Sequence, residues 1–233
     1  MYLLGLIAFI SYFLESIFGF GGTVVFLGLG GLTNDFKEVL LLAIYVALIA
    51  SGTVIFQQRK EMPWGHLKRL TLPFLPGLVI GTLLIDMLAS VWLLKLFALV
   101  MIGNSLQSLL YPQFEAPRMF RMGCLVTGGF IQGLFSCGGP FVLMGYRHEF
   151  KNKSDLRITM ASFFFATNLW KLIQNSATTG SALPVLESYW WTAFPVIAAM
   201  YAGYWVHKRI SEKHFKVGMT IGILLIGVAL LLR

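Results

Sequence analysis

The sequence is poor in charged residues and in cysteine, and each shortage restricts what the chain can be. Only 12% of its 233 residues are charged, whereas 57% are hydrophobic. A soluble domain cannot bury so much apolar surface, so the composition indicates a membrane protein. The two cysteines, Cys124 and Cys137, lie in apolar surroundings, which argues against a structural disulfide.

Motifs of the common enzyme classes are also missing. The sequence contains no H-E-x-x-H metal motif, no G-x-S-x-G nucleophile elbow and no G-x-x-x-x-G-K-[ST] phosphate loop. We therefore expect neither an enzyme nor a bound metal or cofactor. The net charge of +8 does not indicate a nucleic-acid partner, because the basic residues lie between apolar runs and do not alternate with aromatic ones.

What the sequence does contain is a series of apolar segments, most of them near the roughly 20 residues that a membrane-crossing helix needs. We therefore predict an all-α, multi-pass protein of the plasma (inner) membrane, surrounded by lipid. Any face of such helices can also form a homo-oligomer. The segments are near residues 2–30, 37–56, 70–89, 91–111, 119–146, 155–174, 189–206 and 215–232.

An internal repeat relates the first half of the chain to the second. ESIFGFGGTVVFLG at residues 15–28 matches QGLFSCGGPFVLMG at residues 132–145 with an offset of 117. Repeats of this size in a membrane chain predict two homologous four-segment halves in one membrane domain. We place the first repeat at 1–111, a linker at 112–118 and the second repeat at 119–233. Further pairs, at this offset or at 122, are Gln57 and Gln174, Pro73 and Pro195, and Gly81 and Gly203.

The glycines of each motif predict a break in the apolar segment that contains them. A continuous helix from Met1 to Gly31 would be about 46 Å long, more than the hydrocarbon core of about 30 Å. Each segment therefore either turns back as a re-entrant hairpin or crosses as a steeply tilted, kinked helix.

The distribution of basic residues distinguishes these two arrangements. If every segment crosses, ten basic residues lie on one side and seven on the other. If the glycine-broken segments are hairpins, fourteen lie on one side, and only Lys37, Lys95 and Arg233 lie on the other. The second distribution agrees with the positive-inside rule. We therefore predict inverted repeats, each with a re-entrant helical hairpin followed by three transmembrane helices, and both termini outside.

The tip of each hairpin would offer an anion site. The first backbone N–H groups of the returning helix have no partner within it, and the positive end of the helix dipole attracts anions. Pro140 fits the first helical position, and Thr23 adds a hydroxyl group. Inverted halves bring the two tips together near the midplane. The alternative is that the glycine pairs only allow close helix packing, but their occurrence in two matching places favours a transport site.

The sequence resembles the TauE/SafE family of sulfite exporters and related anion permeases. The GFGG and SCGGP elements, the proline and glycine pairs and the four-plus-four plan carry this resemblance over essentially the whole chain. The resemblance implies a permease for sulfite, a sulfonate or a related sulfur anion. Ser136 stands where the first copy has Gly19, so the two tips differ. The glycine motifs of the family correspond here to Gly19, Gly21, Gly22, Gly138, Gly139 and Pro140.

Ionisable residues inside apolar segments are costly and are therefore functional candidates. Glu15, one turn before the first glycine turn, either couples proton movement to the anion or satisfies backbone groups freed by the turn. Lys171 either attracts the anion or extends to the outer interface. Asn168 lies three residues before Lys171 and matches Ser51 in the repeat, so we expect both polar side chains along the path.

Cys137 is either a small apolar filler or a thiol that contacts the substrate. A passive anion channel, and a thiol-dependent membrane redox protein built on Cys124 and Cys137, are the alternatives to a gradient-driven carrier of a small anion. The candidates for ion coupling are Glu15 and Lys171. The candidate substrate-binding residues are Gly19, Gly21, Gly22, Thr23, Ser51, Ser136, Cys137, Gly138, Gly139, Pro140 and Asn168.

Overall fold

The computed structural model describes residues 2–18, 21–59, 64–111, 114, 116–146, 149–150, 153–178, 180, 182–207 and 212–232. Over these residues the chain is helical and has no β-strand, which confirms the all-α prediction. The helices are α1 (Tyr2–Phe18), α2 (Gly22–Gly31), α3 (Phe36–Gln57), α4 (Trp64–Met87), α5 (Ser90–Leu110), η2 (Arg118–Phe120), α6 (Arg121–Phe135), α7 (Gly139–Tyr146), α8 (Lys153–Thr178), α9 (Ala182–Tyr189), η4 (Trp190–Thr192), α10 (Ala193–His207) and α11 (Glu212–Leu231).

Both glycine motifs interrupt their apolar segments, as the sequence predicts. α1 ends at Phe18 and α2 begins at Gly22. Gly21, just before α2, has a φ of 98°, in the left-handed region that glycine adopts at little cost. Ser136 follows α6 with a φ of 56° and is the one non-glycine residue with positive φ in the described part of the chain. Pro140 is the second residue of α7, one position later than expected.

After the first break, α2 lies back along α1. A Cβ built at Gly22 would lie 2.6 Å from the carbonyl oxygen of Ser11, and one at Gly30 would lie 3.7 Å from the side chain of Leu4. Gly22 begins α2 and Gly30 is near its end, whereas Leu4 precedes Ser11 in α1. The two helices therefore run side by side in opposite directions.

After the second break, α7 lies back along α6 in the same way. A Cβ at Gly138 would lie 2.9 Å from the Cβ of Gln132, close to the end of α6. A Cβ at Gly145 would lie 3.4 Å from the carbonyl oxygen of Arg121, at the beginning of α6. The short helix of each motif thus returns toward the start of the helix that precedes it.

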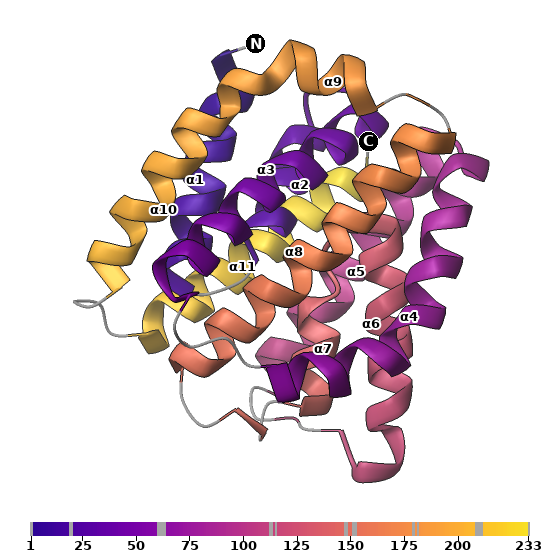
Figure 1. Cartoon of the computed structure of the whole chain (residues 1–233), viewed down its shortest axis with the longest axis vertical. Coiled ribbons are helices and arrows are strands. Elements are labelled where there is room, and N and C mark those ends of the chain that lie inside the picture. The colour runs from indigo at the N-terminus through magenta and orange to yellow at the C-terminus, as the bar shows by residue number, and fades with distance from the viewer. Residues whose placement is uncertain are drawn as a thin grey trace.

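The contacts between helices recur in the two halves of the chain. α1 packs mainly on α10 and α4 mainly on α6, while α3 lies against α8 and α5 against α11 (Figure 1). The repeat offsets relate α1 to α6 and α4 to α10. A Cβ at Gly203 would lie 2.5 Å from the Cβ of Ser16, and one at Gly81 would lie 3.0 Å from the Cα of Gly133. Both contacts join residues that correspond in the repeat.

Three of the described helices are long and apolar enough to cross a membrane, by length and composition. They comprise residues Phe36–Gln57, Trp64–Ile85 and Ser90–Leu110. The six full crossings that the sequence predicts are therefore not all recognisable in this way. α8 has 26 residues but includes Lys153, Asp155, Arg157 and Lys171, which lower its hydropathy, and α10 has only 15 residues.

Candidate functional site

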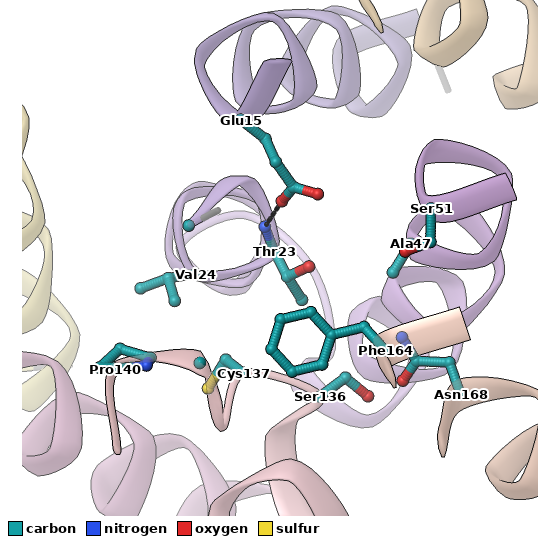
Figure 2. A pocket seen from close by; sticks show the side chains of 12 residues that line it. Glu15, Thr23, Val24, Ala47, Ser51, Ser136, Cys137, Pro140, Phe164 and Asn168 are labelled. Atoms are coloured by element: carbon teal, nitrogen blue, oxygen red, sulfur yellow. Dashed lines mark hydrogen bonds between the residues drawn. The ribbon is translucent and has the colours of Figure 1, made fainter. Parts of the chain in front are cut away.

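A small cavity lies where the two broken helices meet α3 and α8. Figure 2 shows Glu15 and Thr23 at one side of it and Ser136, Cys137 and Pro140 at the other. Its open space is about 20 Å³, enough for roughly one water molecule. The residues that line it are Glu15, Gly21, Thr23, Val24, Ala47, Ser51, Ser136, Cys137, Gly139, Pro140, Phe164 and Asn168.

Most of the residues predicted from the sequence lie at this cavity. Two predicted glycines, Gly22 and Gly138, are not among its lining residues, and neither is Lys171. Gly19 lies outside the described residues. The predicted residues that the structure brings together here are Glu15, Gly21, Thr23, Ser51, Ser136, Cys137, Gly139, Pro140 and Asn168.

Gly22 and Gly138 have a packing role instead. A Cβ at Gly22 would lie 2.7 Å from the Cβ of Glu15, and one at Gly138 would collide with the carbonyl oxygen of Gly128. Both glycines therefore allow the short helix to approach the preceding helix closely. For these two positions the structure agrees with the packing interpretation of the motif.

Glu15 accepts a hydrogen bond from a backbone N–H at the start of α2. The N–H of Thr23 donates to Glu15 Oε2 at 3.3 Å, and the hydroxyl groups of Thr23 and Tyr12 lie 3.3 Å apart. The N–H groups in the first turn of a helix lack partners within the helix. The carboxylate of Glu15 thus satisfies one of the groups that the turn frees, and it lies at the cavity wall at the same time.

Gln132 holds the corresponding position at the second break. The N–H of Gly138 donates to Gln132 Oε1 at 2.9 Å. Gln132 Nε2 donates in turn to Asn168 Oδ1 at 3.1 Å and to Thr167 Oγ1 at 3.2 Å. A neutral amide in the second half therefore does what a carboxylate does in the first, and it fixes the orientation of Asn168.

Asn168 presents an unused donor at the cavity. Its side chain is only 1% exposed, and its Nδ2 atom has no hydrogen-bond partner among the described residues. A buried donor without a partner costs free energy, of the order of 1–3 kcal/mol. Asn168 also lines the cavity, so a group that accepts a hydrogen bond there would satisfy it.

Lys171 is enclosed by protein, so of its two alternatives the one in which it extends to the outer interface is wrong. It is 1% exposed. Its Nζ atom donates to the carbonyl oxygen of Gln132 at 3.0 Å and to Ser136 Oγ at 2.8 Å. These acceptors are at the C-terminal end of α6, where the helix dipole favours a cation. Lys171 therefore places a buried positive charge directly behind Ser136, a cavity residue.

Three lining residues were not predicted from the sequence: Val24, Ala47 and Phe164. Ala47 lies one helical turn before Ser51, and Phe164 lies one turn before Asn168. Ala47 and Phe164 are also related by the repeat offset of 117. Ala47 and Phe164 could therefore have been predicted by combining helical spacing with the repeat.

Arg157 is a further buried cation, and it is not among the site residues predicted from the sequence. It is only 5% exposed. Its Nη2 atom donates to Ser16 Oγ at 3.5 Å and to Gln57 Oε1 at 3.4 Å, and its guanidinium lies 5.0 Å from the centre of the Tyr204 ring. Arg157, Phe164, Asn168 and Lys171 are spaced by seven, four and three residues, so they share one face of α8.

The described residues contain no cluster that could hold a metal, and one free cysteine lies at the cavity. No group of three or more His, Cys, Asp or Glu residues among them can hold a metal ion. Cys124 and Cys137 are both free, and only Cys137 lies at the cavity. The cavity therefore offers a free thiol beside hydroxyl, amide and carboxylate groups.

The described residues form apolar helices, three of them of membrane length, with a small cavity between two broken helices, and these features are typical of membrane transport proteins. The chain belongs to the sulfite exporter TauE/SafE family, whose profile matches residues 4–230. This finding confirms the resemblance noted from the glycine motifs. Comparison with the curated proteins and with the solved structures gave no match.

Proposed function

We propose that the protein is a secondary transporter (permease) that moves a small anion, sulfite or a related sulfur oxyanion or organosulfonate, across the plasma membrane. The observation that carries the proposal is the unpartnered Nδ2 atom of Asn168 at the cavity wall. An amide N–H can only donate, so the group that completes this site is an acceptor. Oxyanions provide several acceptor oxygens.

The surroundings of Asn168 suit an anion. Ser51 and Ser136 contribute hydroxyl groups to the same cavity, and a hydroxyl can donate to an oxyanion. Lys171 donates to Ser136 Oγ and so brings a positive charge close to the wall without contacting the cavity itself. Polar groups and cations inside a membrane protein typically mark the path of its substrate.

The proposal includes the inverted arrangement of the halves at 1–111 and 119–233, with α1–α2 and α6–α7 as re-entrant hairpins. Two contacts with α8 support it. The end of α1 contacts Arg157 through Ser16, whereas the end of α6 contacts Lys171. These α8 residues are 14 positions apart, about 21 Å along the helix. These contacts support hairpin tips that approach from opposite ends of α8, the arrangement we propose for the inverted repeats.

The cavity must widen during transport. Its present space admits roughly one water molecule, whereas an oxyanion with three oxygens needs more room. Val24 on α2 and Pro140 on α7 lie at its wall, so movement of either short helix changes its size. We assign the present form to a closed state between the two states in which one face is open.

Glu15 is our candidate for coupling the anion to protons. Its carboxylate lies at the same cavity, where a negative charge opposes an anion. A proton on Glu15 removes this repulsion, so anion and proton would bind together. Lys171, bonded to the end of α6, keeps the opposite wall positive.

Counterflow of radiolabelled sulfite in proteoliposomes tests the proposal, with thiosulfate, a short sulfonate and sulfate as competitors. We expect saturable counterflow that Asn168→Ala abolishes. Asn104→Ala, on α5 and away from the cavity, is the matched control and should retain it. Anion flux without saturation or counterflow would instead identify a passive channel, and absence of flux for all four anions would reject the anion assignment.

A further inference from the structure

Arg157 is a buried cation that forms no ion pair with the residues that the structure describes. Arginine is rarely enclosed by protein unless it is paired, yet the groups that contact Arg157 are neutral: Ser16, Gln57 and the ring of Tyr204. The hydrogen bonds to Ser16 and Gln57 are long, at 3.5 and 3.4 Å. No carboxylate among the described residues, Glu15 included, forms an ion pair with Arg157.

Two N–H donors are also unused here, one on the guanidinium itself and one on the neighbouring glutamine. Arg157 Nε and Gln57 Nε2 are buried and have no hydrogen-bond partner among the described residues. They belong to groups that already touch one another, since Arg157 Nη2 donates to Gln57 Oε1. Ser16 Oγ donates to the carbonyl oxygen of Met200 at 2.6 Å and accepts from Arg157 Nη2, and neither bond involves Arg157 Nε or Gln57 Nε2. A positive charge with two adjacent unused donors is what an oxyanion requires.

The position of these groups relates them to the cavity. Gln57 ends α3, and Arg157 lies in the second turn of α8. Arg157 and Asn168 share one face of α8 and are 11 residues apart, about 16 Å along the helix. In the sequence, the end of α3 and the start of α8 adjoin the basic segments that the positive-inside rule assigns to the cytoplasm. An anion that moves from this face to the cavity therefore passes Arg157.

We propose that Arg157 and Gln57 form a second anion-binding site, between the cavity and the membrane face with the basic segments. The site takes the same small oxyanion as the cavity, and the inference therefore rests on the proposed function. It holds the anion before it reaches Asn168 on export, or after it leaves on import. The guanidinium supplies the charge, and Arg157 Nε and Gln57 Nε2 supply the donors.

The alternative hypothesis is that Arg157 is purely structural and only joins α1, α3 and α8. The two hypotheses predict different results for one substitution. Gln57→Glu keeps the size of the side chain and places a carboxylate beside Arg157. For a structural arginine this new ion pair stabilises the protein and leaves anion binding unchanged. If Arg157 belongs to an anion site, the new carboxylate forms an ion pair with the guanidinium in place of the anion. The protein then stays folded but no longer binds the second anion.

Equilibrium binding of radiolabelled sulfite to the purified protein in detergent tests the proposal. We expect two anions per chain for the parent protein and one for Arg157→Gln, Gln57→Glu and Asn168→Ala. The double variant Arg157→Gln/Asn168→Ala should bind none. Arg59→Gln is the matched control, because Arg59 is an exposed arginine near the same end of α3, and it should retain two. Thermal unfolding of each variant confirms that it is folded.

Three results would decide against the second site. Two anions bound by both Arg157→Gln and Gln57→Glu would overturn it, as would one anion bound by the parent protein and lost in Asn168→Ala. In both cases the proposed function stands. If the parent protein binds neither sulfite, thiosulfate nor a short sulfonate, the proposed function fails and the second site fails with it.

Discussion

Glu15 and Gln132 hold equivalent places at the two broken helices, and only the first of them is ionisable. Each accepts a hydrogen bond from a backbone N–H at the start of the short helix. If this contact were their only purpose, a neutral amide would suffice in both halves. The carboxylate in one half gives the cavity a group whose charge depends on pH.

We predict that Glu15→Gln removes most of the pH dependence of anion binding. In the parent protein, protonation of Glu15 as the pH falls should strengthen binding, because the carboxylate no longer repels the anion. The glutamine variant should bind at high pH as tightly as the parent binds at low pH. The measurement is binding of a short sulfonate, whose own charge is constant, from about pH 5 to about pH 8.

A matched control for this titration is Glu38→Gln, which changes a carboxylate that lies away from the cavity and accepts a hydrogen bond from Tyr189. The control should keep the pH dependence of the parent. A glutamine variant at position 15 with an unaltered pH profile would show that Glu15 has only a structural role.

Asn168 allows a second test at the residue scale. Asn168→Asp breaks no described hydrogen bond, because Nδ2 has no partner and Oδ1 remains an acceptor for Gln132. We expect the free energy of unfolding to change by no more than about 1–2 kcal/mol. Anion affinity should fall at least about tenfold, since the new carboxylate repels the anion at its main donor.

Binding of sulfite and thermal unfolding, measured on the same preparation, separate these two effects. Asn104→Asp introduces the same charge on α5 and should leave affinity unchanged. Unchanged affinity of Asn168→Asp would mean that the amide does not face the anion, whatever the outcome for stability.

Between elements, the crossing of α4 and α6 depends on glycines that contact backbone. A Cβ at Gly133 would lie 2.6 Å from the carbonyl oxygen of Leu78, whereas one at Gly123 would meet nothing within 4 Å. We therefore predict that Gly133→Ala destabilises the protein by about 1–3 kcal/mol, because the two helices must move apart. Gly123→Ala, on the same helix, should be neutral or stabilising by up to about 1 kcal/mol.

The midpoint of thermal unfolding in detergent compares the two alanine variants directly. Because both substitutions change helix propensity equally, their difference reports the contact with α4. Equal midpoints would contradict the close crossing of α4 and α6.

The sequence was sufficient to predict the helix breaks and most of the cavity wall. Gly21 has a left-handed conformation, which glycine adopts easily. The internal repeat then predicted that Pro140 and Asn168 belong to the same site. For Lys171 one of the two alternatives, extension to the interface, was wrong, and Arg157 was not predicted as a buried cation, both for one physical reason. Hydropathy predicts that lysine and arginine side chains lie at the membrane interfaces. The positions of these two side chains depend instead on hydrogen-bond acceptors, such as Ser136 and Gln57. These acceptors are distant in the sequence, so hydropathy does not reveal them.

Across the whole molecule, the two halves share a plan but differ in charge. The face of α8 with Arg157, Asn168 and Lys171 corresponds, at an offset of 117, to Leu40, Ser51 and Val54 on α3. The second half thus supplies both buried cations, and the first supplies the carboxylate Glu15. A transporter with equal halves would present the same site to both faces. This one presents Arg157 toward one face only, so we expect its two faces to differ in apparent affinity.

The same arrangement predicts the sides of the membrane on which parts of the chain lie. The end of α11 lies near the start of α1: a Cβ at Gly31 would lie 3.6 Å from Leu230, and one at Gly30 would lie 3.7 Å from Leu4. Both ends of the described chain thus lie close together. From the positive-inside rule we expect both of them outside.

A membrane-impermeant thiol reagent should therefore label Leu232→Cys in intact cells, in a background without Cys124 and Cys137. Arg69→Cys, whose side chain is 74% exposed, should be labelled only after the cells are permeabilised. The opposite pattern would reverse the orientation, and labelling of both positions in intact cells would reject the inverted topology.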